Sequence, residues 1–304
     1  MHAISDHTTG RGADSRICFR LKGRSVMLDR RVHAVRGDLA DISLAGLLFA
    51  PHYAKAQPMH CAGQSAFLRQ APSAESVAVS QLLPGEGFHL LDVTGQWAWG
   101  FCEHDGYVGY VERTALATGW LEATHHVTAR AAPLFAAADI KTPVAGTLPA
   151  GARLAGTVEG DFVMTAQGAV HLRHVAPTGE VEADWVAAAQ RQIGQPYVWG
   201  GRGDGGIDCS GLLQLALGQA GIRIPRDSDL QRDSLGMEIE DGDMLRRGDV
   251  LFFPGHVGIM LDADNLLHAN AYWMSTMVEP LADVIDRLRP DHEQPVLARR
   301  RIEL

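Results

Sequence analysis

The stretch PYVWGGRGDGGIDCSGLLQLALGQAG, residues 196–221, joins a glycine-rich loop to a strongly apolar segment. The apolar half is typical of a buried helix, and Gly221 supplies a natural stop for it. Cys209 stands at the junction, so its sulfur should lie near the helix N-terminus. Unpaired backbone N–H groups and the helix dipole at that end favour an anion, which lowers the pKa of a thiol and enriches the reactive thiolate. Cys209 is therefore a candidate nucleophile, with a buried structural cysteine as the alternative.

A cysteine nucleophile needs a base, which is usually a histidine. Two of the 14 histidines fall in a run of predicted strands: His256 begins HVGIML, and His268 lies in NLLHAN. They are 12 residues apart, with Asp262 midway between them in a turn. An antiparallel hairpin closing at Asp262 would bring both imidazoles to one face as near neighbours. One could take the thiol proton while the other fixes its ring; two satisfied, half-buried histidines are the alternative.

Residues 179–304 around these motifs predict an α+β domain. The segment ADWVAAAQRQIG, residues 183–194, has a helical period and a glycine stop. The segment GDVLFF, residues 248–253, predicts a strand ahead of the two histidine strands. Helices followed by a meander of strands are typical of the α+β class.

The chain before residue 179 is rich in short β-forming runs with turn residues between them. Runs spaced by about ten residues over 63–120 predict a small β-barrel. The pattern returns in a weaker copy over 121–178, which predicts two tandem barrels; chance similarity among β-rich segments is the alternative. Residues 1–62 form a lead-in segment expected to pack on a neighbour, and its first 25 or so residues are expected to be mobile.

Composition excludes several classes of protein. The chain has 304 residues and carries 27 Lys+Arg against 36 Asp+Glu, a net charge of -9, which argues against a broad basic surface for nucleic acid. No apolar run reaches the roughly 18 residues of a membrane span. The start MHAISDHTTGRGADSR lacks the apolar core of a secretory signal. The four cysteines have no paired spacing, so we expect a soluble, cytoplasmic protein with reduced thiols.

Two further motifs resemble cofactor-binding or metal-binding patterns but lack the structural context that such sites need. Gly201, Gly203 and Gly206 satisfy GxGxxG, but no long βαβ unit surrounds them, so a dinucleotide site is not expected. His171 and His174 form an HxxH, whose odd separation on a strand directs the rings to opposite faces. We therefore expect no metal and no organic cofactor.

Five motifs carry a family resemblance: PYVWGG, DCSGLLQLAL, PRDSDLQ, GDVLFFPGHVGIML and LLHAN. In that order and spacing, over about 125 residues, they resemble the NlpC/P60 cysteine peptidases. The β-rich segments with QLLPGE and DGYVGYV resemble the bacterial SH3-type domains that precede one subgroup, the γ-D-glutamyl-L-diamino acid endopeptidases or dipeptidyl-peptidases VI. The resemblance implies two SH3-like β-barrels and a papain-like domain, with Cys209 as nucleophile, His256 as base and His268 as orienter.

The resemblance also implies a set of substrate contacts. The tyrosine of DGYVGYV that limits substrate length corresponds to Tyr107, with Tyr110 as the alternative. A glutamate expected upstream of QLLPGE has no match in register, because Glu75 lies about two residues away and Val77 takes the position. The other residues that match the lining of the site are Tyr197, Asp208, Ser210, Asp227 and Ser228. We expect Asp208, together with Tyr107, to meet the free amine of the substrate's L-Ala.

The function implied is hydrolysis of the bond between γ-D-Glu and a diamino acid, diaminopimelate or lysine. The substrate would be a small murein peptide with an unblocked N-terminal L-Ala, cleaved to L-Ala-γ-D-Glu during cell-wall peptide recycling. We expect no nucleic-acid, membrane or obligate protein partner. The alternatives are an amidase or acyltransferase of the same fold, a non-catalytic SH3-type peptidoglycan-binding protein, and an exported enzyme.

Overall fold

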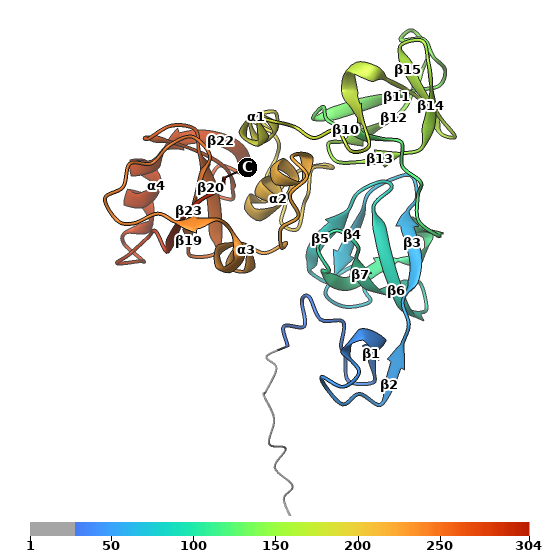
Figure 1. Ribbon diagram of the computed structural model, residues 1–304, viewed down its shortest axis with the longest axis horizontal. Coiled ribbons are helices and arrows are strands. Elements are labelled where there is room, and N and C mark those ends of the chain that lie inside the picture. Colours follow the sequence, from blue (N-terminus) through green and yellow to red (C-terminus); the bar gives the residue numbers. More distant parts are fainter. Residues whose placement is uncertain (1–27, 304) are drawn as a thin grey trace, which may run out of the picture.

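The computed structural model describes residues 28–303, so the predicted mobile start lies outside the described residues. The described chain is mostly β-structure with four α-helices (Figure 1). None of these helices has both the length and the apolar character needed to cross a membrane. Four parts follow one another: an N-terminal segment (28–54), a first β unit (57–118), a second β unit (125–177) and a C-terminal unit (185–301).

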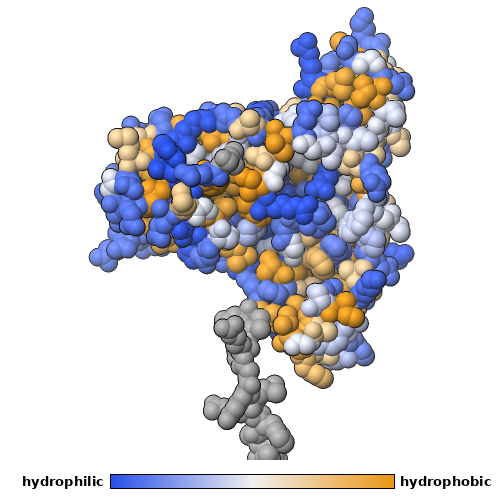
Figure 2. All heavy atoms as spheres, viewed as in Figure 1, coloured by the Kyte–Doolittle hydropathy of each residue, from blue (hydrophilic) through white to orange (hydrophobic). Residues whose placement is uncertain are grey.

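The N-terminal segment holds a short parallel pair of strands, β1 (Leu39–Asp41) and β2 (His52–Ala54), joined through a 3-10 helix, η1 (Ile42–Leu44). Its small core is formed by Ala40, Leu44 and Ala50. Hydrophobic side chains are also exposed over this segment, at the lower end of the molecule in Figure 2.

The first β unit is a seven-stranded sheet in the order β5-β4-β8-β7-β6-β3-β9. Its core is built from alternate inward-facing residues that include Leu68, Leu82, Phe88 and Val111. The strands are β3 (Gln57–Cys61), β4 (Ala66–Arg69), β5 (Ala78–Leu82), β6 (Gly87–Thr94), β7 (Trp97–Cys102), β8 (Val108–Glu112) and β9 (Leu116–Thr118), with a 3-10 helix, η2 (Arg113–Ala115), before β9.

The second β unit contains a five-stranded sheet, β12-β11-β16-β15-β14, and a three-stranded sheet, β13-β10-β17. Both β units end in the same order, a strand, a 3-10 helix and a strand. The elements are β10 (His125–Val127), β11 (Ala131–Phe135), β12 (Val144–Pro149), β13 (Arg153–Leu154), β14 (Gly156–Glu159), β15 (Phe162–Thr165), β16 (Gly168–His171), η3 (Leu172–His174) and β17 (Val175–Pro177).

Two features of these units differ from the sequence prediction. Closed barrels are not confirmed, because the strand pairing gives open sheets whose edge strands in the first β unit are β5 and β9. Strand β3 pairs with both β6 and β9, so the first sheet begins at Gln57, inside the predicted 1–62 lead-in. The sequence signal missed β3 because Pro58 interrupts its β-forming run.

The C-terminal unit has helices on both faces of an antiparallel sheet in the order β18-β23-β19-β20-β21-β22. Helix α2 lies between this sheet and the β units (Figure 1) and is buried almost all round, which explains why its sequence is mostly apolar. The predicted helices and the three predicted strands are confirmed. The elements are α1 (Trp185–Gln190), α2 (Cys209–Gln219), α3 (Ser228–Ser234), β18 (Met237–Glu238), β19 (Asp249–Phe253), β20 (His256–Met260), β21 (Asn265–Asn270), β22 (Ser275–Pro280), α4 (Leu281–Leu288) and β23 (Ala298–Arg301).

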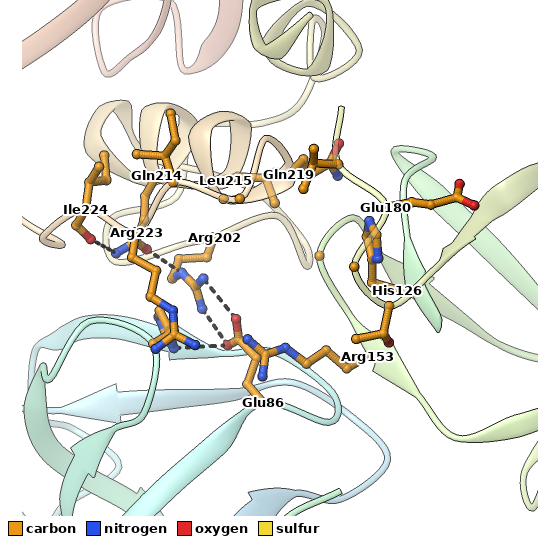
Figure 3. A pocket seen from close by; sticks show the side chains of 18 residues that line it. Glu86, His126, Arg153, Glu180, Arg202, Gln214, Leu215, Gln219, Arg223 and Ile224 are labelled. Carbon is orange, nitrogen blue, oxygen red and sulfur yellow. Dashed lines mark hydrogen bonds and ion pairs between the residues drawn. The ribbon is translucent and has the colours of Figure 1, made fainter. Parts of the chain in front are cut away.

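Buried charges join the first β unit to the C-terminal unit. The Arg202 guanidinium donates to Glu86 at 2.6 and 3.0 Å, and both residues are 4% exposed. Gln214 of α2 donates to Asp105 at 2.9 Å. A cavity of about 400 Å³ lies beside the Arg202–Glu86 pair, between α2 and both β units (Figure 3). Cys209 is not among the residues that line it, so the cavity is separate from the candidate site below.

Candidate active site

Cys209 is the first residue of α2, as predicted, and is 8% exposed. The preceding residue, Asp208, caps the helix by accepting a 2.7 Å hydrogen bond from the backbone N–H of Gly211. Cys209 and Val257 belong to one core cluster, and the backbone N–H groups of Ser210 and Val257 favour the thiolate of Cys209. Because Val257 follows His256 in β20, these contacts place the thiol beside the first histidine strand.

The predicted lowering of the Cys209 pKa is wrong. Burial raises the pKa of the thiol to about 12, and the neighbouring Asp208 carboxylate adds to this. The two backbone N–H groups act in the opposite direction but do not outweigh burial. Burial and the proximity of His268 likewise lower the pKa of His256 to about 3. The resting pair is therefore a neutral thiol beside a neutral imidazole.

The two histidines are near neighbours, as predicted from their spacing. His256 Nε2 lies 2.8 Å from His268 Nδ1. The hairpin register pairs Ile259 with Leu267, which centres the turn one residue beyond Asp262. The imidazoles are therefore diagonal neighbours on one face.

Asp262 has a different part in that turn. Its carboxylate accepts hydrogen bonds from the backbone N–H groups of Asp264 and Asn265 at 2.9 and 2.8 Å. It closes the hairpin as a side-chain cap and does not mark its midpoint.

Behind His268 lies a carboxylate that the sequence analysis missed. Glu279 Oε1 is 2.8 Å from His268 Nε2, and Asn270 Nδ2 approaches the same ring nitrogen at 2.8 Å. Glu279 in turn accepts hydrogen bonds from Arg287 and from the indole of Trp273. Only the register of β22 against β21 could have revealed it, since no motif surrounds Glu279 in STMVEP.

Asp208 is occupied by internal donors. Its two oxygens accept hydrogen bonds from Arg226 at 3.0 and 2.7 Å, from Gly200 and Gly211, and from Ser210. Asp208 is 5% exposed and Arg226 is 1% exposed. This arrangement argues against the direct contact with a substrate amine that we expected of Asp208. Ser210 is also buried, and its hydroxyl accepts a hydrogen bond from Arg226.

Tyr107 reaches the C-terminal unit from the first β unit. Its hydroxyl donates a 2.9 Å hydrogen bond to Asp227 Oδ2, the residue that precedes α3. Arg31 of the N-terminal segment donates to the same oxygen at 2.9 Å. The predicted alternative, Tyr110, lies within β8 opposite Trp99. Three segments far apart in the sequence thus meet at Asp227.

The other residues predicted to contact substrate lie in several different parts of the structure. Tyr197 packs against the core that contains Cys209, and its backbone N–H donates to Met274. Burial raises the pKa of Tyr197, and the nearby Cys209 adds to this. Ser228 begins α3 beside Asp227. Glu75 is exposed in the turn between β4 and β5, and the residue at the matching position, Val77, is 55% exposed.

One group of side chains has the spacing of metal ligands. Cys102, His104 and Asp105 offer ligand atoms within 4.8 Å of one another. His104 lies 3.2 Å from Asp105 Oδ2 and 3.8 Å from Glu86 Oε2, beside Arg202. We interpret the group as part of the buried ion cluster between the units, because the positive Arg202 already compensates the carboxylates.

Comparison with known proteins agrees with this geometry. Residues 194–283 match the NlpC/P60 family, and residues 68–116 match the bacterial dipeptidyl-peptidase Sh3 domain. The chain is 39% identical over 100 residues to a "probable endopeptidase" of Mycobacterium tuberculosis, which covers 32% of this chain and 25% of that protein. It is 41% identical over 85 residues to "Dipeptidyl-peptidase 6" of Lysinibacillus sphaericus, covering 28% of this chain and 31% of that protein.

The matched part thus spans about a quarter to a third of these curated relatives. Among solved structures, an NlpC/P60 family protein from Bacillus cereus superposes with a TM-score of 0.67. The match covers 80% of this chain and 99% of that one at 19% identity, a likeness of fold alone. The chain therefore contains an NlpC/P60 domain preceded by an SH3 domain of the bacterial dipeptidyl-peptidase type.

Proposed function

We propose that this protein is a cysteine peptidase that cleaves the γ-D-Glu–diamino acid bond of free murein peptides. The observation that carries the proposal is the placement of Cys209 at the start of α2, beside β20 and its His256–His268 pair. The NlpC/P60 match supports an endopeptidase. The match to the dipeptidyl-peptidase type of SH3 domain supports this substrate class.

The reaction would begin with a neutral thiol. As Cys209 Sγ attacks the γ-carbonyl carbon of D-Glu, its proton passes to His256, and the carbonyl oxygen becomes an oxyanion. The Cys209 backbone N–H would stabilise that oxyanion, and we assign the Tyr197 hydroxyl, near the sulfur, as a second donor. Because the backbone donor is fixed at the start of α2 and Tyr197 packs against the core that contains Cys209, little reorganisation would accompany the attack.

The intermediate then collapses to a thioester. The C–N bond breaks, and His256 returns its proton to the leaving amine of the diamino acid. A water molecule attacks the thioester, gives a proton to His256 and releases L-Ala-γ-D-Glu. The proton on His256 finally returns to the sulfur of Cys209, so each turnover consumes one water.

The Tyr107–Asp227 contact supports recognition of a free N-terminal amine. Around it, Asp29, Asp227 and Asp229 share the single guanidinium of Arg31. Three carboxylates against one cation leave this end of the site with excess negative charge, which favours an ammonium ion. Of these groups, Asp227 is the one that Tyr107 orients, so we assign the amine contact to Asp227 rather than to Asp208.

A site closed in this way would accept free peptides and reject wall in which the same L-Ala is acylated. We therefore propose a role in peptide recycling within the cytoplasm. The test is mass spectrometry of L-Ala-γ-D-Glu-diaminopimelate incubated with the protein and with its Cys209→Ser variant. Release of L-Ala-γ-D-Glu by the wild type alone supports the proposal. Transfer of the acyl group to another amine would instead identify an acyltransferase.

A further inference from the structure

We propose that Glu279 is a positioning residue that fixes the tautomer of His268 and, through it, the tautomer of His256. The inference rests on the roles proposed above for His256 and the thiol. The three side chains come from the adjacent strands β20, β21 and β22. Because His268 pairs with Met277, Glu279 lies two residues further along the same face, diagonal to His268.

The contacts form one continuous line of hydrogen bonds. Glu279 Oε1 lies 2.8 Å from His268 Nε2, and His268 Nδ1 lies 2.8 Å from His256 Nε2. His268 is 1% exposed and Glu279 is 6% exposed, so water has little access to this line. Proton positions along it are therefore set by the protein groups themselves.

Glu279 determines which nitrogen donates in each of these hydrogen bonds, because an ionised carboxylate can accept a hydrogen bond but cannot donate one. Burial alone would raise its pKa, but hydrogen bonds from Arg287 and Trp273 outweigh burial and lower the pKa to about 2. His268 Nε2 must then carry a proton and donate it to Glu279. His268 is 1% exposed, and Arg287 already balances the Glu279 charge through both carboxylate oxygens. Burial therefore lowers the pKa of His268 although Glu279 acts in the opposite direction, and the neutral ring leaves Nδ1 as an acceptor.

The same logic fixes the next ring. Since His268 Nδ1 is an acceptor, the nitrogen that faces it, His256 Nε2, must be the donor. His256 is neutral as well, so its Nδ1 keeps a lone pair. That lone pair is what a base needs to take the proton of Cys209. A carboxylate two strands away thus keeps His256 in the form that can act.

Asn270 offers the competing arrangement. Its Nδ2 also lies 2.8 Å from His268 Nε2 and would donate there if that nitrogen were unprotonated. In that arrangement Glu279 Oε1 would face a second lone pair at 2.8 Å, a repulsive contact between buried groups. When His268 Nε2 carries the proton, the unfavourable contact is between that N–H and the Asn270 NH₂, which are both neutral. This contact costs less than a charged carboxylate facing a lone pair, so the arrangement in which His268 donates to Glu279 has the lower energy.

The surroundings hold the carboxylate in place. Arg287 of α4 donates to both Glu279 oxygens, at 3.0 and 2.6 Å, and its guanidinium lies 4.0 Å from the centroid of the Tyr272 ring. Trp273 donates its indole N–H at 3.0 Å. A glutamine at position 279 would turn its oxygen toward Arg287 and Trp273 and its NH₂ toward His268. That NH₂ would reverse the tautomers of both histidines.

The first test uses the wild-type protein without substrate. Two-bond ¹H–¹⁵N correlation spectra of ¹⁵N-histidine-labelled protein distinguish protonated from bare ring nitrogens, with His268 assigned from a His268→Asn spectrum. We expect a protonated Nε2 and a bare Nδ1 on His268. A bare Nε2 would overturn the proposal; the tautomer is read from the wild type, and the variant serves only to assign the His268 signals.

The second test uses Glu279→Gln. We expect a reversed His268 tautomer and a kcat at least about a hundredfold lower, because an imidazole held in the wrong tautomer cannot act as base. KM should change less than about threefold, since Glu279 acts through the histidines and not on the substrate. Glu279→Asp keeps a carboxylate and should retain the wild-type tautomer.

The matched control is Glu293→Gln, which makes the same change at an exposed site in the C-terminal unit and should alter neither readout. A Glu279→Gln protein with unaltered tautomers, or with near wild-type kcat, would overturn the proposal. If the wild type cleaves no murein peptide, the proposed function fails, but the spectra still decide the tautomers.

Discussion

The Tyr107 hydroxyl donates a 2.9 Å hydrogen bond to Asp227, joining the first β unit to the start of α3. Burial raises the pKa of this tyrosine, and the Asp227 carboxylate raises it further, so the hydroxyl keeps its proton and remains a donor. The contact couples the first β unit to the NlpC/P60 domain at one end of the proposed substrate site.

Removal of the Tyr107 hydroxyl should weaken recognition of a free amine. Tyr107→Phe leaves Asp227 without one of its donors, and a hydrogen bond to a charged group contributes roughly 1.5–3 kcal/mol. We expect kcat/KM for L-Ala-γ-D-Glu-diaminopimelate to fall about tenfold or more, mainly through KM. Tyr110→Phe, three residues further on in β8, is the control and should leave the kinetics unchanged. Equal effects from the two variants would show that Tyr107 has no special position.

The two histidines should differ in importance. His256→Ala should abolish turnover as completely as loss of the nucleophile, because nucleophile and base act as a unit. His268→Ala should cost less, since it only positions the ring of His256. The measurement is kcat for each variant, after circular dichroism has confirmed the fold. If His268→Ala proves more damaging, the two roles have been exchanged.

The thiol should behave as a buried, neutral group in the resting enzyme. Because the pKa of Cys209 is raised to about 12, its thiolate fraction grows about tenfold per pH unit through the neutral range. The rate of alkylation by iodoacetamide should therefore still be rising above pH 9. Cys209→Ser measures the background from other thiols. A rate that levels off near neutral pH would indicate a preformed thiolate and contradict this account.

The buried pair between the units should contribute stability that acid removes. Glu86→Gln leaves Arg202 buried without its anion, a change that typically costs about 3–5 kcal/mol in the free energy of unfolding. Despite burial, Arg202 and His104 lower the pKa of Glu86 below its ordinary value of 4.5. The contribution is therefore complete above about pH 4.5 and is lost as pH falls through the lowered pKa.

Denaturant unfolding of Glu86→Gln at neutral and acidic pH checks this prediction. Glu112→Gln, at an exposed position of β8, is the control and should unfold like the wild type. A Glu86→Gln protein as stable as the wild type at neutral pH would mean that the pair contributes nothing to the contact between the units.

Local sequence patterns predicted much of the C-terminal unit. The glycine-rich loop, the apolar run and the glycine stop located α2 and placed Cys209 at its first residue. The even separation of His256 and His268 predicted two imidazoles on one face, because side chains alternate along a strand. These features depend on residues close in sequence, where periodicity is informative.

The features that escaped prediction depend on distant parts of the chain. The contact of Arg31 with Asp227 joins residues 196 positions apart, and Glu279 reaches His268 only through the register of a third strand. The direction of the Cys209 pKa was wrong because a helix N-terminus can be read from sequence, whereas the burial that outweighs it cannot.

The most direct test of the account compares two substrates. L-Ala-γ-D-Glu-diaminopimelate and its N-acetyl form are incubated separately with the protein, and release of the dipeptide is followed by mass spectrometry. We predict that acetylation lowers kcat/KM at least about a hundredfold, roughly 2.7 kcal/mol of transition-state stabilisation, because the proposed contact of the free ammonium with Asp227 would be lost. Equal cleavage of the two peptides would contradict the account, since the site would then be open at that end.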